Sequence, residues 1–468
     1  MIKFFRKINF KYNGMIKLKD KEISNLEKNL MTSGSIWKTI LIFSIPLIIG
    51  NLLQQTYNTI DSMIVGNFVG SSALAAVGSS TALINLLISF AQGIAVGSGI
   101  IVAQSLGSNA RKDVRVSIHT SMALALVLGL VISIMGYVFA PWLLEKMQTP
   151  SEVMPESIEY LRVFSLGLIF NVIYNMEAGI LNAVGNSKRS LLYLSIASFT
   201  NVVLDFIFIK YLGMGVRGAA IATNISQFIS ALLALLFLLR IPEIYKVSLK
   251  KIKIHKDMAL RIIKVGIPTA IQGTVISLSN VIMQSSVNVF GAMPMAGFGA
   301  FIKIDSFNIL PVLSLSLAIT TFAGQNYGAG KIDRVKKGMW TTLFMTIIYT
   351  IISGTMLYNF APKVIALFTK EPDVIAAGVL ATKFFCPFYF LLAIMHSLAG
   401  TVRGTGRTVP PMLIMILSLC VFRILAAKFV IPHYNTIENV YLLYPISWTI
   451  GAILMIGYTI KADWTKEV

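Results

Sequence analysis

Residues 36–66 read IWKTILIFSIPLIIGNLLQQTYNTIDSMIVG, a mostly apolar run with Pro46 near its start and one acidic residue, Asp61, near its end. The run is long enough to cross the hydrocarbon core of a bilayer, which is about 30 Å thick. In lipid every backbone polar group needs a partner within the protein, so a run of this length forms a helix. A membrane β-barrel would show shorter, alternating segments. The segment therefore predicts a membrane-spanning α-helix.

Eleven further apolar segments of this kind follow along the chain. They lie at 72–106, 114–140, 155–184, 190–212, 216–240, 258–290, 293–325, 338–360, 374–401, 409–431 and 438–460. With 56% hydrophobic and only 13% charged residues over 468 positions, the chain cannot be arranged as a soluble globule. We expect an all-α integral membrane protein of about twelve transmembrane helices.

The second half of the chain repeats the first half. Ile45-Pro46 recurs 222 residues later as Ile267-Pro268, and Asn67 recurs 221 residues later as Asn288. Other pairs at this spacing are Gly70 and Gly291, Ala140-Pro141 and Ala361-Pro362, Gln104 and Gln325, and Gly185 and Gly406. Because each half holds six spans, both halves run in the same direction, and a pseudo-twofold axis along the membrane normal relates them. We expect a tail (1–35), an N-terminal six-helix bundle (36–240), a linker (241–257) and a C-terminal six-helix bundle (258–468).

The formal net charge of +20 indicates membrane topology rather than nucleic-acid binding. We assign 30 of the 40 Lys and Arg residues to alternate loops on one side, Arg403 and Arg407 among them. The positive-inside rule then places both termini in the cytoplasm and the chain in the inner membrane of a bacterium or archaeon. The lipid bilayer is the expected partner of these basic residues, and no nucleic acid is.

Four acidic residues fall inside predicted spans, where a charge is costly and usually functional. They are Asp61, Glu177, Asp205 and Asp305. The first three lie in the first half, and their repeat equivalents are apolar: Ile282, Leu398 and Ala426. This asymmetry predicts an ion or proton site in the N-terminal bundle.

Asn201 precedes Asp205 by one helical turn, so the two share a helix face, and Thr223 can join them from the next helix. With Asp61 they supply hard oxygen ligands that suit a small alkali cation such as Na⁺. The same carboxylates can hold a proton instead, and the sequence leaves H⁺ and Na⁺ both open. The chain has no phosphate-binding loop and no catalytic motif. We therefore expect no enzymatic activity and no cofactor, with transport driven by an ion gradient.

We assign five residues to a substrate cleft between the bundles: Gln54, Tyr57, Glu177, Met283 and Asp305. Two of them have alternatives, because Asp305 can form an ion pair with Lys303 or Lys383, and Glu177 can be a satisfied polar residue. Pro46 is either an inert kink or a functional hinge.

These features together resemble the multidrug and toxic compound extrusion family over about residues 32–464. The resemblance rests on Pro46 with Asp61 fifteen residues later, on the Asn201-Val-Val-Leu-Asp205 run, and on Gly218-Ala-Ala-Ile-Ala-Thr223. It implies that Asp61, Asn201, Asp205 and Thr223 form an H⁺ or Na⁺ site, and that the first helix bends at Pro46 to expel substrate. It also implies that a monomer works alone and exports bulky organic cations.

The chain looks closer to the branch of that family that resembles DNA-damage-inducible protein F, because it has no Glu in the seventh span and Ala426 at the repeat equivalent of Asp205. We therefore expect no second cation site in the C-terminal half. A flippase for lipid-linked saccharides is an alternative with the same architecture; it would need a cationic cleft for its pyrophosphate headgroup. A non-transporting membrane protein is a further alternative.

Overall fold

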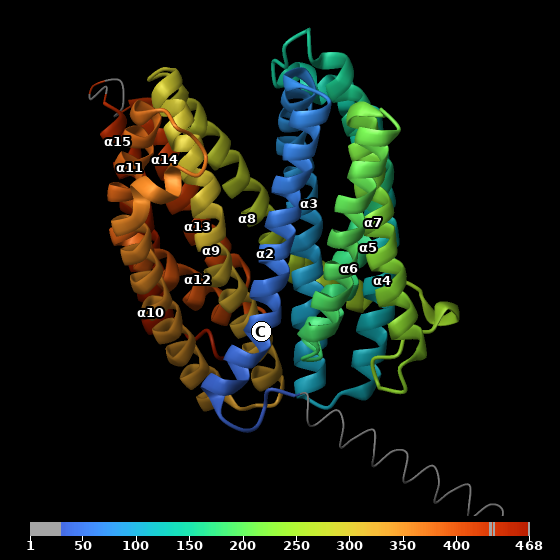
Figure 1. The fold of residues 1–468 in the computed structure, drawn as a ribbon. Coiled ribbons are helices and arrows are strands. Elements are labelled where there is room, and N and C mark those ends of the chain that lie inside the picture. The colour runs from blue at the N-terminus through green and yellow to red at the C-terminus, as the bar shows by residue number, and fades with distance from the viewer. Residues whose placement is uncertain (1–29, 430–432, 434–435, 467–468) are drawn as a thin grey trace, which may run out of the picture.

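The computed structural model describes residues 30–429, 433 and 436–466 and shows two bundles of helices (Figure 1). The N-terminal bundle comprises α2 (Ile36–Phe68), α3 (Ser71–Gly107), α4 (Arg111–Lys146), α5 (Met154–Ala183), α6 (Ser187–Asp205), the π-helical segment η1 (Phe206–Tyr211) and α7 (Gly215–Arg240). Most of the predicted tail, 1–29, lies outside the described residues.

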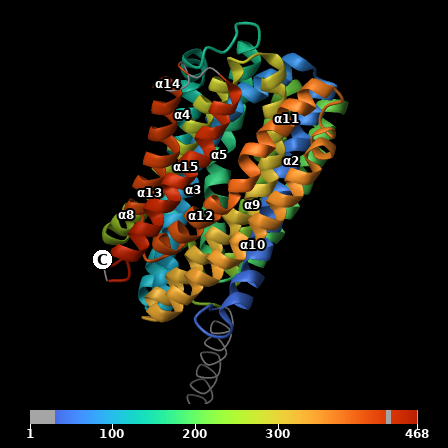
Figure 2. The same cartoon turned by 90° about the vertical axis from the view of Figure 1, so that its left-hand side faces the viewer.

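The C-terminal bundle follows a short connection that contains the 3₁₀ turn η2 (Leu249–Lys251). It comprises α8 (Lys256–Asn288), α9 (Ala292–Gly328), α10 (Ile332–Ile365), α11 (Pro372–Phe385), η3 (Cys386–Phe388), α12 (Tyr389–Gly404), α13 (Val409–Ile416), η4 (Leu417–Val421), α14 (Phe422–Phe429) and α15 (Ile437–Lys461). The helices of both bundles run roughly along one direction (Figure 2).

The predicted fold class is confirmed, because 12 helices in the described part of the chain are long and apolar enough to cross a membrane. Three of these spans are interrupted helices: α6 continues through η1, α11 through η3 into α12, and α13 through η4 into α14. The observed helices extend a few residues beyond the predicted apolar runs, as at Ile332–Ile365 for the predicted span 338–360. Hydrophobicity marks only the part of a helix that lies in lipid, whereas backbone hydrogen bonds continue past it.

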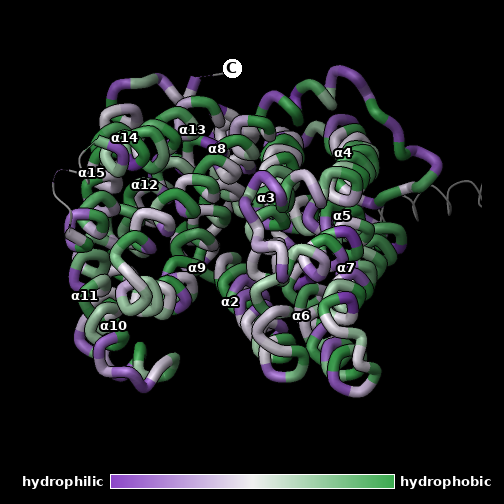
Figure 3. Tube along the Cα trace, turned by 90° about the horizontal axis from the view of Figure 1, so that it is seen from above, coloured by the Kyte–Doolittle hydropathy of each residue, from purple (hydrophilic) through white to green (hydrophobic). Residues whose placement is uncertain are grey.

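The first helix of each bundle packs on both bundles. The first half of α2 places Ile40 and Phe43 in a core cluster with Ile319 and Phe322 of α9. The first half of α8 packs on α3 so closely that a Cβ at Gly97 would lie 2.4 Å from the Cα of Gly266. Seen from above, these four helices lie along the junction between the bundles, and apolar residues colour the outer helices α4 and α14 (Figure 3).

The two bundles meet at the end where the chain enters α2 and diverge towards the top of Figure 1. We call the end where the bundles meet the closed end. There the last turns of α3 and α9 cross with almost no side chain between them. A Cβ at Gly107 would lie 1.9 Å from the carbonyl oxygen of Gln325, and one at Gly328 would lie 2.0 Å from that of Gln104. The glutamines also bridge the bundles, because Gln104 Nε2 donates to the carbonyl of Gly404 (2.9 Å) and Gln325 Nε2 to that of Ala183 (2.8 Å). These contacts follow the sequence repeat.

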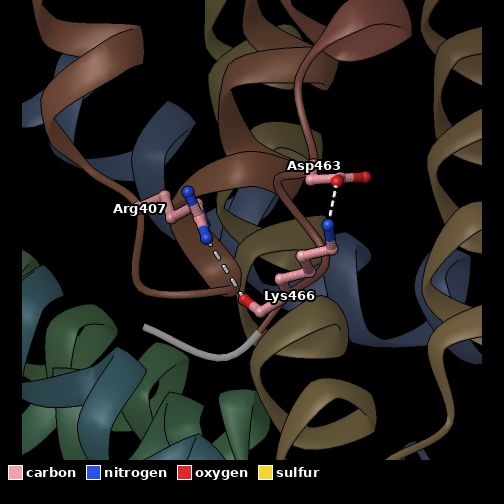
Figure 4. Close-up of polar contacts among 3 residues, drawn as sticks. All are labelled: Arg407, Asp463 and Lys466. Atoms are coloured by element: carbon pink, nitrogen blue, oxygen red, sulfur yellow. Dashed lines mark hydrogen bonds and ion pairs between the residues drawn. The ribbon is translucent and has the colours of Figure 1, made fainter.

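Both described ends of the chain lie against this closed end. The backbone N–H of Met31 donates to Gln325 Oε1 (2.7 Å), and Arg334 donates to the carbonyls of residues 31, 33 and 34. At the other described end, Tyr327 donates to the carbonyl of Lys466, and Arg407 donates to the same carbonyl (Figure 4).

The Lys466 ammonium forms an ion pair with Asp463 and, by donating a hydrogen bond to it, lowers the pKa of that carboxyl. Both described ends of the chain lie on one side of the molecule, as an even number of spans requires.

We predict that Gly328→Ala loosens the closed end, because its methyl group would overlap the backbone of Gln104. Spin labels at Lys112→Cys and Lys336→Cys are expected to report a longer and broader distance distribution by electron paramagnetic resonance. Gly299→Ala on the same helix is the matched control, since nothing lies within 4 Å of its added Cβ. An unchanged distribution in Gly328→Ala would contradict the role given to this contact.

Candidate functional site

Two buried carboxyl groups lie side by side in the N-terminal bundle. Asp61 belongs to the second half of α2, and Asp205 is the last residue of α6 before η1. They are 9% and 0% exposed, and their carboxyl groups are close enough to interact electrostatically. The wider π-helical turn that begins at Phe206 interrupts the regular ladder directly after Asp205, an irregularity common at functional sites.

Asn201 and Thr223 complete this group. Asn201 Nδ2 donates to Thr223 Oγ1 (3.3 Å) across α6 and α7, so the amide oxygen of Asn201 is left without a partner. Oδ1 of Asp61 and both carboxyl oxygens of Asp205 are also buried and without a hydrogen bond. The structure thus brings together the four residues that the sequence singles out. We call Asp61, Asn201, Asp205 and Thr223 the acidic cluster.

Tyr57, predicted for the cleft, lies instead beside the carboxyls of the acidic cluster, with its ring 8% exposed. Tyr160 of α5 also lies near both carboxyls, and Gln227 of α7 lies near Tyr57. Sequence reasoning missed these last two residues. A signal existed for Gln227, which follows Thr223 by one helical turn on the same face of its span.

The acidic cluster has the properties of a site for H⁺ or Na⁺. Its free atoms are carboxyl and amide oxygens, the ligands that a small hard cation prefers. Neither acid has a basic partner, because the one ion pair among the described residues is that of Lys466 with Asp463. Burying unpaired carboxylates costs free energy, so a proton or a cation bound at this position would lower that cost.

A cavity of about 560 Å³ lies between the two bundles. Its walls come from α2, α3, α5 and α6 on one side and from α8, α9 and α12 on the other. We call it the interlobe pocket. Pro46 and Gln54 of α2 line it, so the helix that carries Asp61 also forms one wall. No residue that lines the interlobe pocket is acidic.

Of the five residues predicted for the substrate cleft, Gln54 alone is among those that line the interlobe pocket. Glu177 is fully buried within the N-terminal bundle, with both carboxyl oxygens unpartnered. Met283 is fully buried in the apolar core of the C-terminal bundle. Periodicity alone did not show which face of these helices meets the pocket.

Asp305 accepts a short hydrogen bond from the Tyr389 hydroxyl. The alternative of an ion pair with Lys303 or Lys383 is wrong for the described residues, where neither lysine forms one. The Lys303 ammonium lies over the ring of Phe368 instead, 5.9 Å from its centroid.

The structure corrects the assignment of Arg403 to a loop. The apolar run ends at residue 401, but α12 continues to Gly404 and places Arg403 among the residues that line the interlobe pocket. The chain leaves the helix through Gly406, whose φ of +89° favours glycine, with its N–H bonded to the carbonyl of Arg403. His396, two turns earlier on the same face of α12, also lines the pocket.

Twelve spans in two repeated bundles around a central pocket define a polytopic membrane transporter. The sequence profile of the MatE family matches residues 46–207 and 268–428, more than half of the chain, and the chain belongs to this family. Because its members are transporters, the expectation that the chain is not an enzyme is confirmed.

Two relatives come from Bacillus subtilis (strain 168). The probable multidrug resistance protein YpnP is 30% identical over 84% of this chain and 88% of its own length. The probable multidrug resistance protein YoeA is 28% identical over 92% and 95%.

Two solved structures are each 25% identical to the chain. One is described as a transporter of the MOP superfamily from Pyrococcus furiosus with reversed polarity of its binding pocket; it has a TM-score of 0.87 and covers 94% of this chain and 98% of its own. The other is an outward-facing multidrug resistance transporter of the MATE family, with a TM-score of 0.86, covering 93% and 98%.

We predict that Asp205→Asn unfolds at a temperature no lower than that of wild type at pH 8. The substitution keeps the shape of the side chain and removes a buried carboxyl group that has no hydrogen-bond partner. Thermal unfolding in neutral detergent measures this. Asp305→Ala is the contrasting variant; it leaves the buried Tyr389 hydroxyl without its acceptor and is expected to lower the midpoint by roughly 2–4 °C. Marked destabilisation by Asp205→Asn would show that Asp205 has a structural partner.

Proposed function

We propose that the chain is a secondary active antiporter that exports drug-like amphipathic molecules in exchange for H⁺ or Na⁺ bound at the acidic cluster. The observation that carries this proposal is the set of buried, unpartnered oxygens on Asp61, Asn201 and Asp205. The names of the B. subtilis relatives support drug-like substrates. The finer substrate class predicted from the sequence, bulky organic cations, stays a prediction.

The coupling site is proposed for the N-terminal bundle only. The repeat equivalents of Asp61 and Asp205 are Ile282 and Ala426, which supply no ligand. Occupation of the acidic cluster changes the charge next to the second half of α2, while the first half of α2 packs on α9. A bend at Pro46, which lines the interlobe pocket, would transmit this change to the substrate. Pro46 is therefore proposed as the hinge.

The distribution of basic residues supports an orientation with the closed end in the cytoplasm. Residues 31–34 and 463–466, at the two described ends of the chain, lie at that end, next to the basic residues Lys331, Arg334 and Arg407. The conformation is then open to the outside, and alternating access is proposed as a rocking of one bundle against the other. We propose the cell membrane as the location and the monomer as the working unit.

Vesicles with reconstituted protein and separately imposed Na⁺ and H⁺ gradients test the coupling. Efflux of ethidium and of the amphipathic anion taurocholate is measured in turn, because the charge of the substrate is a separate question from the coupling ion. One of the two gradients is expected to drive efflux of at least one probe. Asp61→Asn and Asp205→Asn are expected to reduce this gradient-driven rate by about tenfold or more, because neither amide can exchange a proton or charge-balance a cation.

Asp333→Asn is the control, since it removes an exposed carboxylate from the first turn of α10. It is expected to transport at the wild-type rate. The proposal would be overturned if efflux by wild type does not depend on either gradient. It would also be overturned if Asp61→Asn and Asp205→Asn both keep the gradient-driven rate.

A further inference from the structure

The interlobe pocket carries a positive charge and no negative charge. Arg403 lines it on the side of the C-terminal bundle, with His396 near by, and no lining residue is acidic. We propose that the pocket binds the anionic group of an amphipathic substrate at Arg403. This proposal rests on the export function proposed above. This site differs from the acidic cluster in charge and in bundle.

The position of Arg403 is fixed by close packing of α12 on α9. A Cβ at Gly400 would lie 2.6 Å from the carbonyl oxygen of Ser316, and one at Gly404 would lie 2.5 Å from that of Thr320. Glycines four residues apart allow this approach of two helix backbones. Arg403 stands one residue before the second glycine, so it lies at the edge of the contact, where the pocket begins.

Hydrogen bonds hold the guanidinium against α9. Arg403 Nη2 donates to Ser316 Oγ (3.0 Å), and that hydroxyl donates to the carbonyl of His396 (2.7 Å). The Nε of Arg403 is buried and has no partner. The guanidinium is thus oriented on one side and has donors to spare on the other.

Arg403 has no counter-ion in the part of the chain that the structure describes, where Lys466 with Asp463 is the one ion pair. A half-buried guanidinium without a counter-ion is unfavourable, because neither full hydration nor an opposite charge compensates it. A carboxylate, sulfonate or phosphate group would neutralise it through short, charge-assisted and bidentate hydrogen bonds.

The rest of the pocket fits the body of an amphipathic molecule. The repeat equivalent of Arg403 is Asn182, which faces the pocket from α5 with a buried, unpartnered Oδ1 and adds a polar but uncharged group. Leu47, Leu194 and Ile276 are among the apolar lining residues. The charge therefore lies on one wall and apolar contacts on the others. An organic cation in the same place would be repelled by Arg403.

The test is equilibrium binding in neutral detergent without any gradient, so failure of coupling does not affect it. Radiolabelled taurocholate and the organic cation tetraphenylphosphonium serve as probes of opposite charge. Wild type is expected to bind taurocholate the more tightly of the two. Arg403→Gln is expected to weaken taurocholate by about tenfold or more and to leave tetraphenylphosphonium unchanged or tighter. Arg403→Lys keeps the charge and is expected to retain most of the affinity.

Arg407→Gln is the matched control, because this arginine lies four residues further on, does not line the pocket and binds the carbonyl of Lys466 (Figure 4). Equal affinity of wild type and folded Arg403→Gln for taurocholate would overturn the proposal. So would tighter binding of tetraphenylphosphonium than of taurocholate by wild type, a comparison that needs no variant.

Nanodiscs distinguish a soluble anion from a lipid headgroup. Taurocholate binding is compared in phosphatidylcholine and in phosphatidylglycerol discs, whose headgroup carries a phosphate and a net negative charge. Competition by phosphatidylglycerol that is lost in Arg403→Gln would identify the headgroup as the ligand. Absence of competition with intact taurocholate binding would identify a soluble amphipathic anion. Each result supports an anion site at Arg403.

Discussion

The structure depends on the direct contact of helix backbones between the two bundles. Membrane helices gain little from burying apolar surface against each other, because lipid is equally apolar, so close packing at small residues joins them. Here α3 meets α8 at Gly97 and Gly266, and the ends of α3 and α9 meet at Gly107 and Gly328. These contacts lie in one half of the molecule. They close that end and leave the opposite ends of the bundles apart.

Charges inside the bilayer have different roles in the two bundles. The N-terminal bundle buries carboxyl groups and amide oxygens beyond the wall of the pocket, in a place that admits an ion but not a large substrate. The C-terminal bundle presents Arg403 directly on the pocket surface. Because the carboxyl groups of the acidic cluster and the Arg403 guanidinium lie in different bundles, they do not form an ion pair with each other. In the proposed mechanism, the coupling ion and the anionic substrate group bind at sites that do not neutralise each other in the empty protein.

The helix α2 connects these parts. Its first half packs on the C-terminal bundle, its middle lines the interlobe pocket at Pro46 and Gln54, and its second half carries Asp61 beside Asp205. A change of shape in this one helix affects the closed end, the pocket and the acidic cluster together. The corresponding helix α8 packs on both bundles in the same way but has no acidic residue in its membrane part. The repeated architecture is therefore symmetric, while its chemistry is not.

Long apolar segments, the 221-residue repeat and the few acids in the spans were enough to predict twelve helices, two bundles and the acidic cluster, because each depends on local composition or on spacing along one helix. Helix faces and helix ends were not predictable in this way. Met283 and Glu177 turn into their own bundles, and Tyr57 lies beside the acidic cluster with Gln227 near it, because packing between helices sets the rotation of each one. The apolar run ends at residue 401 and therefore predicts a loop position for Arg403. In the structure α12 continues past this run and packs on α9 through Gly400 and Gly404. Sequence determines which residues enter the membrane, and tertiary contacts alone decide which cavity each of them meets.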